Sequence, residues 1–148
     1  ISKGEKVTFT GTMTSAAGQN WDTLGVELYT YGKTSWFFRG DNYIYGGPSD
    51  QPDTGVSIAG ENWTVVKSNT GSSNWDAFRE ELKNCAVTVT VDWTNETQIV
   101  ITMVFGQYTQ TYTITASSGE LAQDYVLGFG FENSQTIFTN VVRTSVKA

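Results

Sequence analysis

The chain has 148 residues, of which 39% are hydrophobic and 16% are charged, a balance typical of one folded domain rather than a disordered chain. Its formal net charge of −6 disfavours nucleic acid and anionic membrane surfaces as partners, because binding to phosphates requires Lys and Arg. The chain has no histidine and a single cysteine, Cys85, which excludes a histidine-dependent nucleophilic triad and an intrachain disulfide.

Alternation of apolar and polar residues predicts β-strands along most of the chain. In chain order, the predicted strands cover residues 6–13, 24–31, 35–40, 87–93, 98–105, 107–115, 125–132 and 136–146. The sixth follows the fifth after Gly106, which predicts a hairpin there. Patterns of period two that are rich in Val, Thr, Tyr and Phe are typical of an all-β antiparallel sandwich, here expected as a jelly roll.

Residues 74–84 are predicted to form one short amphipathic helix that packs on an edge of the sandwich. Ser73 and Asp76 have the spacing of a capping box, and apolar residues recur at helical spacing from Trp75 onward. We therefore expect Trp75 in the core. Trp93 alternates with valines on one strand face and is expected there as well.

Paired carboxylates are the catalytic arrangement that the composition leaves open. A sandwich-fold glycosidase needs two of them about 5–10 Å apart across one cleft. Glu27, Asp41 and Glu132 are candidates, with Glu27 and Glu132 expected on outer strand faces. The Glu-x-Asp-x-x-Glu cluster of sandwich-type glucanases is absent, so we predict a protein without catalytic residues. The alternative for Glu27 and Glu132 is a solvated strand face or an ion pair with Arg39.

Several aromatic residues stand in polar, glycine-rich stretches. Trp21 follows Ala-Ala-Gly-Gln-Asn, Tyr43 and Tyr45 are expected at a loop tip, and Trp63 follows Gly-Glu-Asn. The C–H faces of pyranose rings pack on such aromatic planes, and stacking of this kind contributes about 1–3 kcal/mol per ring. The pattern favours a sugar-binding surface. The alternative is that each ring covers an end of the core.

The segment around Trp36 gives a further pair of candidates. Trp36 and Phe38 share one face of a predicted strand, and Arg39 lies on the other. If Trp36 points inward, Arg39 points outward and offers a forked donor suited to pairs of hydroxyls. Trp36 itself remains a candidate ligand contact if the strand is turned the other way.

The predicted strand before Asn133 carries two glycines on its outer face. Gly128, Gly130 and Glu132 alternate with apolar residues that are expected to face the core. Glycine within a strand often marks close approach of a ligand or another backbone. We expect Gly128 and Gly130 to form the bottom of a groove with Glu132 and Asn133 at its edge. The alternative is a strand that crosses under a loop.

Four segments along nearly the whole chain carry a resemblance to a known class of domain. They are KVTFTGTMTSAAGQNW (6–21), WFFRGDNYIYGG (36–47), NWDAFREEL with the following AVTVTV (74–91), and GFGFENSQTIFTNVVR (128–143). Together they resemble the β-sandwich carbohydrate-binding modules attached to bacterial plant-polysaccharide hydrolases, the cellulases and hemicellulases.

The resemblance implies an extracellular, monomeric, non-catalytic module, with residues 1–148 forming one domain of a larger multimodular protein. It implies binding to β-linked polysaccharide (β-1,4-glucan such as cellulose, mixed-linkage glucan, xyloglucan or mannan) that targets a tethered hydrolase catalytic domain. Mapped here, the site would comprise Trp21, Tyr43, Tyr45, Trp63, Arg39, Asp41, Glu132 and Asn133. No cofactor is required, although modules of this kind often hold a structural calcium, for which Asp50 and Asp53 lie in a suitable loop. The alternatives are a sandwich-fold glycosidase or lyase and a protein-binding scaffold domain.

Overall fold

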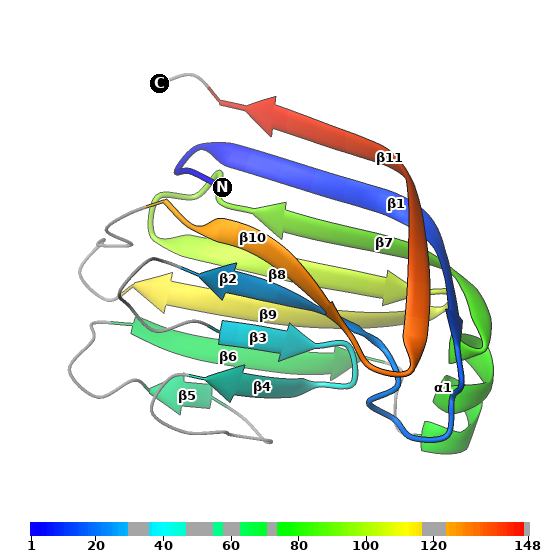
Figure 1. Ribbon diagram of the computed structural model, residues 1–148. Coiled ribbons are helices and arrows are strands. Elements are labelled where there is room, and N and C mark those ends of the chain that lie inside the picture. Colours follow the sequence, from blue (N-terminus) through cyan, green and yellow to red (C-terminus); the bar gives the residue numbers. More distant parts are fainter. Residues whose placement is uncertain (30–35, 47–54, 58–62, 71–73, 117–123, 147–148) are drawn as a thin grey trace.

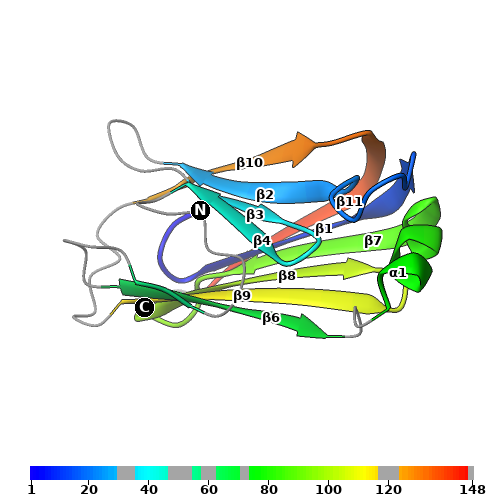
Figure 2. The same cartoon turned by 90° about the horizontal axis from the view of Figure 1, so that it is seen from below.

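The computed structural model describes residues 1–29, 36–46, 55–57, 63–70, 74–116 and 124–146, with backbone only at residues 45–46, 55–57, 63–64, 69–70 and 116. The described chain forms two antiparallel sheets packed face to face, which confirms the predicted all-β sandwich with one short helix (Figure 1 and Figure 2).

The larger sheet has seven strands and the smaller has four. In spatial order the large sheet comprises β11 (Ser134–Ser145), β1 (Glu5–Ser15), β7 (Asn84–Asp92), β8 (Gln98–Phe105), β9 (Tyr108–Ala116), β6 (Trp63–Thr70) and β5 (Gly55–Ser57). The small sheet comprises β10 (Val126–Phe131), β2 (Leu24–Tyr29), β3 (Trp36–Arg39) and β4 (Tyr43–Gly46). Strands β4, β5 and β6 were not predicted, and Tyr43 and Tyr45 lie on β4 rather than at a loop tip.

Alternation along each strand places one face in the core between the sheets. On β8, Ile99, Ile101, Met103 and Phe105 are fully buried, and the residues between them are partly exposed. Trp93, predicted to be a core residue, is only 1% exposed. Burial of each large apolar side chain contributes about 1.5–3 kcal/mol relative to leaving it in water, which makes this layer the main source of stability.

Helix α1 (Trp75–Leu82) is shorter than predicted and begins with a different cap. The side chain of Asn74 accepts the hydrogen bond from the Ala77 backbone N–H, and the expected cap, Ser73, lies outside the described residues. Asn74 is a strong N-cap residue because its side-chain oxygen satisfies one of the unpaired N–H groups of the first turn. Trp75 packs against the core only partly, with its ring edge-on to Phe78 at 5.6 Å between centroids.

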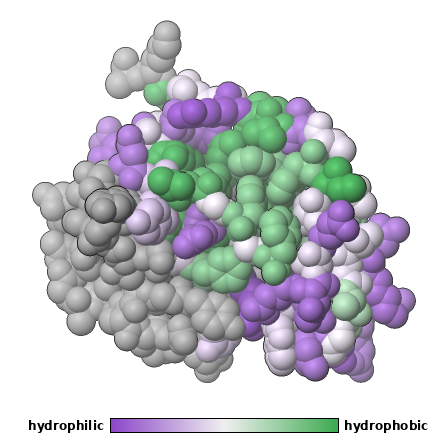
Figure 3. Space-filling view, in the orientation of Figure 1, coloured by the Kyte–Doolittle hydropathy of each residue, from purple (hydrophilic) through white to green (hydrophobic). Residues whose placement is uncertain are grey.

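The side of the sandwich formed by β10 and β11 is open. Each of these strands pairs with one neighbour among the described strands, β10 with β2 and β11 with β1. Phe131 was predicted to be in the core and is instead 46% exposed, because no other described strand pairs with β10 at this edge of the small sheet. Val141 on β11 is 55% exposed for the same reason. Figure 3 looks onto the small sheet and shows apolar surface gathered on this side.

Candidate functional site

Four residues from separate segments surround one open cavity of about 320 Å³. Trp21 comes from the loop between β1 and β2, Arg39 ends β3, Tyr43 begins β4, and Glu132 lies in the turn between β10 and β11. The Trp21 side chain is 41% exposed. All four were sequence candidates, although Glu132 was expected on a strand face. The structure therefore brings an exposed indole, a phenol, a guanidinium and a carboxylate to one depression.

The buried carboxylate of Asp22 holds the loop that carries Trp21. Its Oδ2 accepts hydrogen bonds from the backbone N–H groups of Gly18 at 2.8 Å and Gln19 at 3.1 Å. Its Oδ1 accepts one from Asn133 Nδ2 at 3.0 Å, which ties the loop to the β10–β11 turn. A carboxylate that accepts several N–H groups makes strong, charge-assisted bonds. Trp21 is therefore exposed on a braced backbone rather than on a free loop.

Helix α1 also holds the loop that carries Trp21, through a hydrogen bond to the residue before Trp21. Arg79 Nη1 donates to Asn20 Oδ1 at 2.7 Å, and the adjacent Arg79 Nη2 forms an ion pair with Asp76 on its own helix. The guanidinium thus links the first turn of the helix to the residue before Trp21. The helix helps to position the site without lining it.

The turn between β3 and β4 contains Gly40, Asp41 and Asn42, and it folds Asp41 back onto Arg39. Asn42 adopts a left-handed conformation (φ 71°), as expected at the end of a three-residue hairpin loop. Arg39 donates from Nε to Asp41 Oδ1 and from Nη2 to Asp41 Oδ2, the latter at 2.8 Å. The two side chains are only 9% and 6% exposed. This two-point pair fixes the guanidinium plane at the base of the cavity.

Aromatic rings lie against the same guanidinium. Arg39 Cζ is 4.7 Å from the centroid of the Tyr43 ring and 5.6 Å from that of Trp21. Arg39 points to the outer face of the small sheet, as an inward Trp36 requires, but it is packed under rings instead of standing in solvent. Cation–π contacts of this kind favour a fixed orientation of both rings. Arg39 therefore helps to hold the rings of Trp21 and Tyr43 in place in the wall of the cavity.

Tyr112 of β9 anchors the β3–β4 hairpin to the large sheet from below. Its fully buried hydroxyl donates to the Arg39 carbonyl and lies 3.2 Å from the Tyr43 carbonyl oxygen. Burial, reinforced by the negative charge of Asp41, raises the pKa of the Tyr112 hydroxyl well above its ordinary value, so it stays a donor. Lys67 Nζ adds a hydrogen bond of 2.9 Å to the carbonyl of Asn42.

Two sequence candidates, Trp36 and Asp41, are buried in the structure rather than at the surface. Trp36 is 1% exposed and packs between the sheets against Phe38 and Tyr125, so its proposed ligand contact is corrected to a core role. The alternation of a four-residue strand allowed either face to point inward. The face with Trp36 and Phe38 points inward because it buries more apolar surface than the face with Phe37 and Arg39. Asp41 is paired with Arg39, whereas Asn133 stays exposed and donates its side-chain hydrogen bond to Asp22.

Other candidates lie outside what the structure describes. These are the side chains of Tyr45 and Trp63, and the expected calcium-binding residues Asp50 and Asp53. Among the described residues, no group of three or more Cys, Asp or Glu side chains is arranged to hold a metal ion. In the same part of the chain, no helix has the length and apolar character needed to cross a bilayer.

The three carboxylates that the sequence offered as a catalytic pair have different surroundings in the structure. Glu132 is the carboxylate among the four residues that line the cavity. Glu27 lies on the outer face of β2, and Asp41 is held in its ion pair with Arg39. General acid–base hydrolysis of a glycosidic bond uses two carboxyl groups that flank the bond. Among the described residues that line this cavity, Glu132 is one such carboxyl group.

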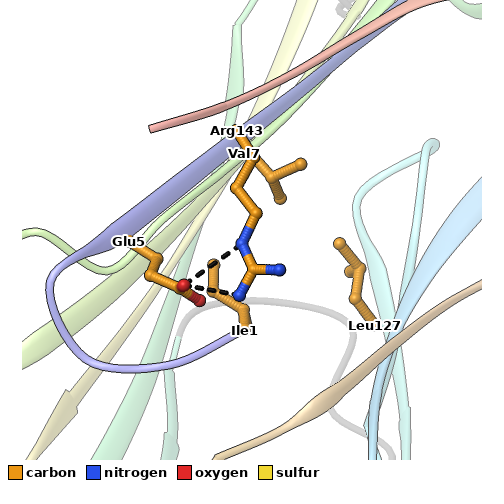
Figure 4. Close-up of a pocket in the computed structure, with 5 residues that line it drawn as sticks. All are labelled: Ile1, Glu5, Val7, Leu127 and Arg143. Carbon is orange, nitrogen blue, oxygen red and sulfur yellow. Dashed lines mark hydrogen bonds and ion pairs between the residues drawn. The ribbon is translucent and has the colours of Figure 1, made fainter. Parts of the chain in front are cut away.

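A second pocket of about 180 Å³ lies between the edges of the two sheets (Figure 4). Arg143 donates to Glu5 Oε1 from Nε at 3.1 Å and also from Nη2, and Ile1, Val7 and Leu127 supply the remaining walls. The Ser2 backbone N–H and then Arg143 lower the pKa of Glu5. This pocket is aliphatic and its charges are paired, so it lacks the aromatic wall of the first cavity.

Sequence reasoning missed Phe37, which lies on the outer face of the small sheet beside Arg39. A Cβ atom added at Gly25 would fall 2.4 Å from Phe37 Cζ, and one added at Gly130 would fall 2.6 Å from Phe37 Cε2. The ring therefore packs against two glycines, Gly25 on β2 and Gly130 on β10. The signal was present in the glycines of the strand 126–131, but which ring covers them depends on the order of the strands.

Comparison of the chain with protein-family models, curated proteins and solved structures finds no significant match. A function for the chain therefore has to be inferred from the chemistry of its site.

Proposed function

We propose that this chain is a non-catalytic carbohydrate-binding module for β-linked plant polysaccharide. The observation that supports this most is the open cavity in which the 41% exposed ring of Trp21 stands beside Tyr43, Arg39 and Glu132. An exposed indole on a braced loop is preorganised for stacking, which lowers the entropy cost of binding a partner. A pyranose ring fits this site because its C–H face stacks on the indole while its hydroxyls reach polar groups at the edge.

The polar groups around the cavity match neutral hydroxyl partners better than charged ones. Arg39 is neutralised by Asp41, whereas the exposed carboxylate of Glu132 can accept hydrogen bonds from sugar hydroxyls. The negative charge of the chain as a whole also leaves an uncharged ligand as the simplest partner. In this proposal the ligand is a β-1,4-glucan, mixed-linkage glucan, xyloglucan or mannan.

The wider role follows from binding without catalysis. A module that holds polysaccharide raises the local concentration of substrate for a catalytic domain in the same protein. We therefore propose that it acts as an extracellular monomer tethered to a glycoside hydrolase and needs no cofactor for binding.

Affinity gel electrophoresis and titration calorimetry against soluble β-glucan, xyloglucan, mannan and xylan test this function. We expect retention by at least one polysaccharide, and a loss of affinity of about 5- to 150-fold in Trp21→Ala, the equivalent of one stacked ring. Ile137→Ala is the matched control, because Ile137 is 61% exposed on β11 and does not line the cavity. Absence of retention by all four polysaccharides would refute the proposal, and release of reducing ends would point to a hydrolase instead.

A further inference from the structure

We propose that the ligand continues from the cavity onto the outer face of the small sheet, where Phe37 forms a second stacking platform. The inference rests on the proposed function and specifies the ligand further. It is an uncharged glycan bound along the length of its chain, across several sugar units, rather than gripped at one end. The glycine pattern of the small sheet, the orientation of Phe37 and its position beside the cavity support it.

The outer face of the small sheet has three glycines where side chains would otherwise stand. Gly25 on β2 pairs with Gly130 on β10, and Gly128 lies two residues before Gly130 on the same face. Outward-facing side chains normally stand roughly perpendicular to a sheet. Without them, β2 and β10 present a low surface next to β3, on which a neighbouring ring can lie.

Phe37 fills this low surface with its ring face parallel to the sheet. A Cβ atom on Gly25 would lie 2.4 Å from Cζ and at nearly equal distances, 2.8 and 2.9 Å, from the two Cε atoms. These distances place the point beneath the ring face rather than beyond its edge. Phe37 starts on β3, and its ring also reaches Gly130 two strands away, so the side chain lies along the sheet. The residue is partly exposed.

The platform is continuous with the cavity. Gly25, which the Phe37 ring covers, is the register partner of Arg39, a residue that lines the cavity. Phe37 precedes Arg39 by two positions on β3, so the two outward-facing residues are roughly 7 Å apart along the strand. Trp21, Tyr43 and Phe37 thus offer aromatic surface on both sides of the Arg39 position. In this proposal, a linear glycan that contacts both parts runs past Arg39.

Acidic side chains accompany this path and limit the class of glycan. Glu27 is the register partner of both Phe37 and Gly128, and its Oε2 lies 3.6 Å from the position of a Cβ on Gly128. The Glu27 side chain therefore lies close to the sheet surface beside Phe37, and Glu132 lines the cavity. Both carboxylates accept hydrogen bonds from hydroxyls, whereas a uronic acid beside them suffers like-charge repulsion. The path suits a neutral glycan and disfavours polyuronates.

A chain-length series tests the platform. Wild-type protein and variants are titrated by calorimetry with oligosaccharides from the disaccharide to the hexasaccharide of the polysaccharide that the wild type retains best. We expect wild-type affinity to rise with length. In Phe37→Ala, affinity for the hexasaccharide should fall about 5- to 150-fold with little change for the disaccharide.

Two glycine variants on one strand face form a matched pair that keeps the ring. An alanine at position 130 would place its Cβ 2.6 Å from Phe37 and force the ring to move, whereas one at position 128 meets atoms only at ordinary contact distance. Gly130→Ala should lower hexasaccharide affinity, and Gly128→Ala should preserve it. Thermal unfolding of both variants checks that each is folded.

The possible results separate this inference from the proposed function. If Trp21→Ala weakens binding but Phe37→Ala and Gly130→Ala keep the wild-type dependence on length, the platform is wrong and the module assignment stands. If the wild type binds no oligosaccharide or polysaccharide, both are wrong. Binding of polygalacturonate as tight as that of the neutral glycan would overturn the restriction to uncharged ligands.

Discussion

Removal of the Tyr112 hydroxyl should destabilise the fold and weaken ligand binding together. The hydroxyl is fully buried and joins β9 of the large sheet to the carbonyls of Arg39 and Tyr43, which border the cavity. Tyr112→Phe keeps the ring and its packing on Phe38, at 5.1 Å between centroids. The loss is therefore that of a buried hydrogen bond, about 1–3 kcal/mol when an acceptor is left without its donor.

Urea unfolding measures this loss, with Tyr108→Phe as the control. Tyr108 is on the same strand, is 7% exposed and packs edge-on to Phe78, and its hydroxyl makes no hydrogen bond to the part of the chain that the structure describes. We expect Tyr108→Phe to change the free energy of unfolding by less than about 0.5 kcal/mol. An equal effect in both variants, or no effect in Tyr112→Phe, would refute the role of the hydroxyl as an anchor of the β3–β4 hairpin.

Three other predictions concern charge and burial. Asp41→Ala removes the two-point ion pair of the largely buried Arg39 guanidinium and should cost about 3–5 kcal/mol in urea unfolding, whereas a cost below about 1 kcal/mol would show that the pair is solvated. Burial, followed by the charge of Glu81, raises the pKa of Cys85 to about 11, so a thiol reagent near neutral pH should react slowly with the folded chain and rapidly in urea; fast reaction with the folded chain would contradict this. Because the pKa of Glu5 is lowered in the folded state, its carboxylate stabilises the fold at pH values above its ordinary pKa of 4.5. This stabilisation is lost as the pH falls through the lower pKa of the folded state. Glu5→Gln should therefore be less stable than wild type near neutral pH and equal to it in strong acid, as measured by urea unfolding at each pH.

The fold class was predictable because most strands repeat with period two. Leu24, Val26 and Leu28 alternate cleanly with Glu27 and Tyr29, and their burial follows from that pattern. The strands that were missed lack the pattern. β4 combines tyrosines with glycine, and its pairing with β3 depends on the turn at residues 40–42, which local propensity does not reveal.

The composition of the site was easier to predict than its assembly. Trp21 and Tyr43 stood out because polar neighbours could not bury them, but their meeting with Glu132 requires β10 to lie beside β2 in the small sheet. The partner of Arg39 was also missed. A bend at residues 40–42 brings Asp41 back onto it, and a reading of alternating faces cannot show a contact within a turn.

Glycine in a strand costs roughly 0.5–1 kcal/mol relative to alanine, and larger β-branched residues would favour a strand further. The small sheet nevertheless has Gly25, Gly128 and Gly130 on one outer face. Two of them accommodate the ring of Phe37, which a Cβ atom at either position would displace. Stability alone is poorly served by this arrangement, because a phenyl ring on an exposed face could be replaced by polar side chains at no loss of core. The proposed glycan platform would give Gly25 and Gly130 a physical reason, because they let the Phe37 ring lie along the sheet as contact area for a ligand.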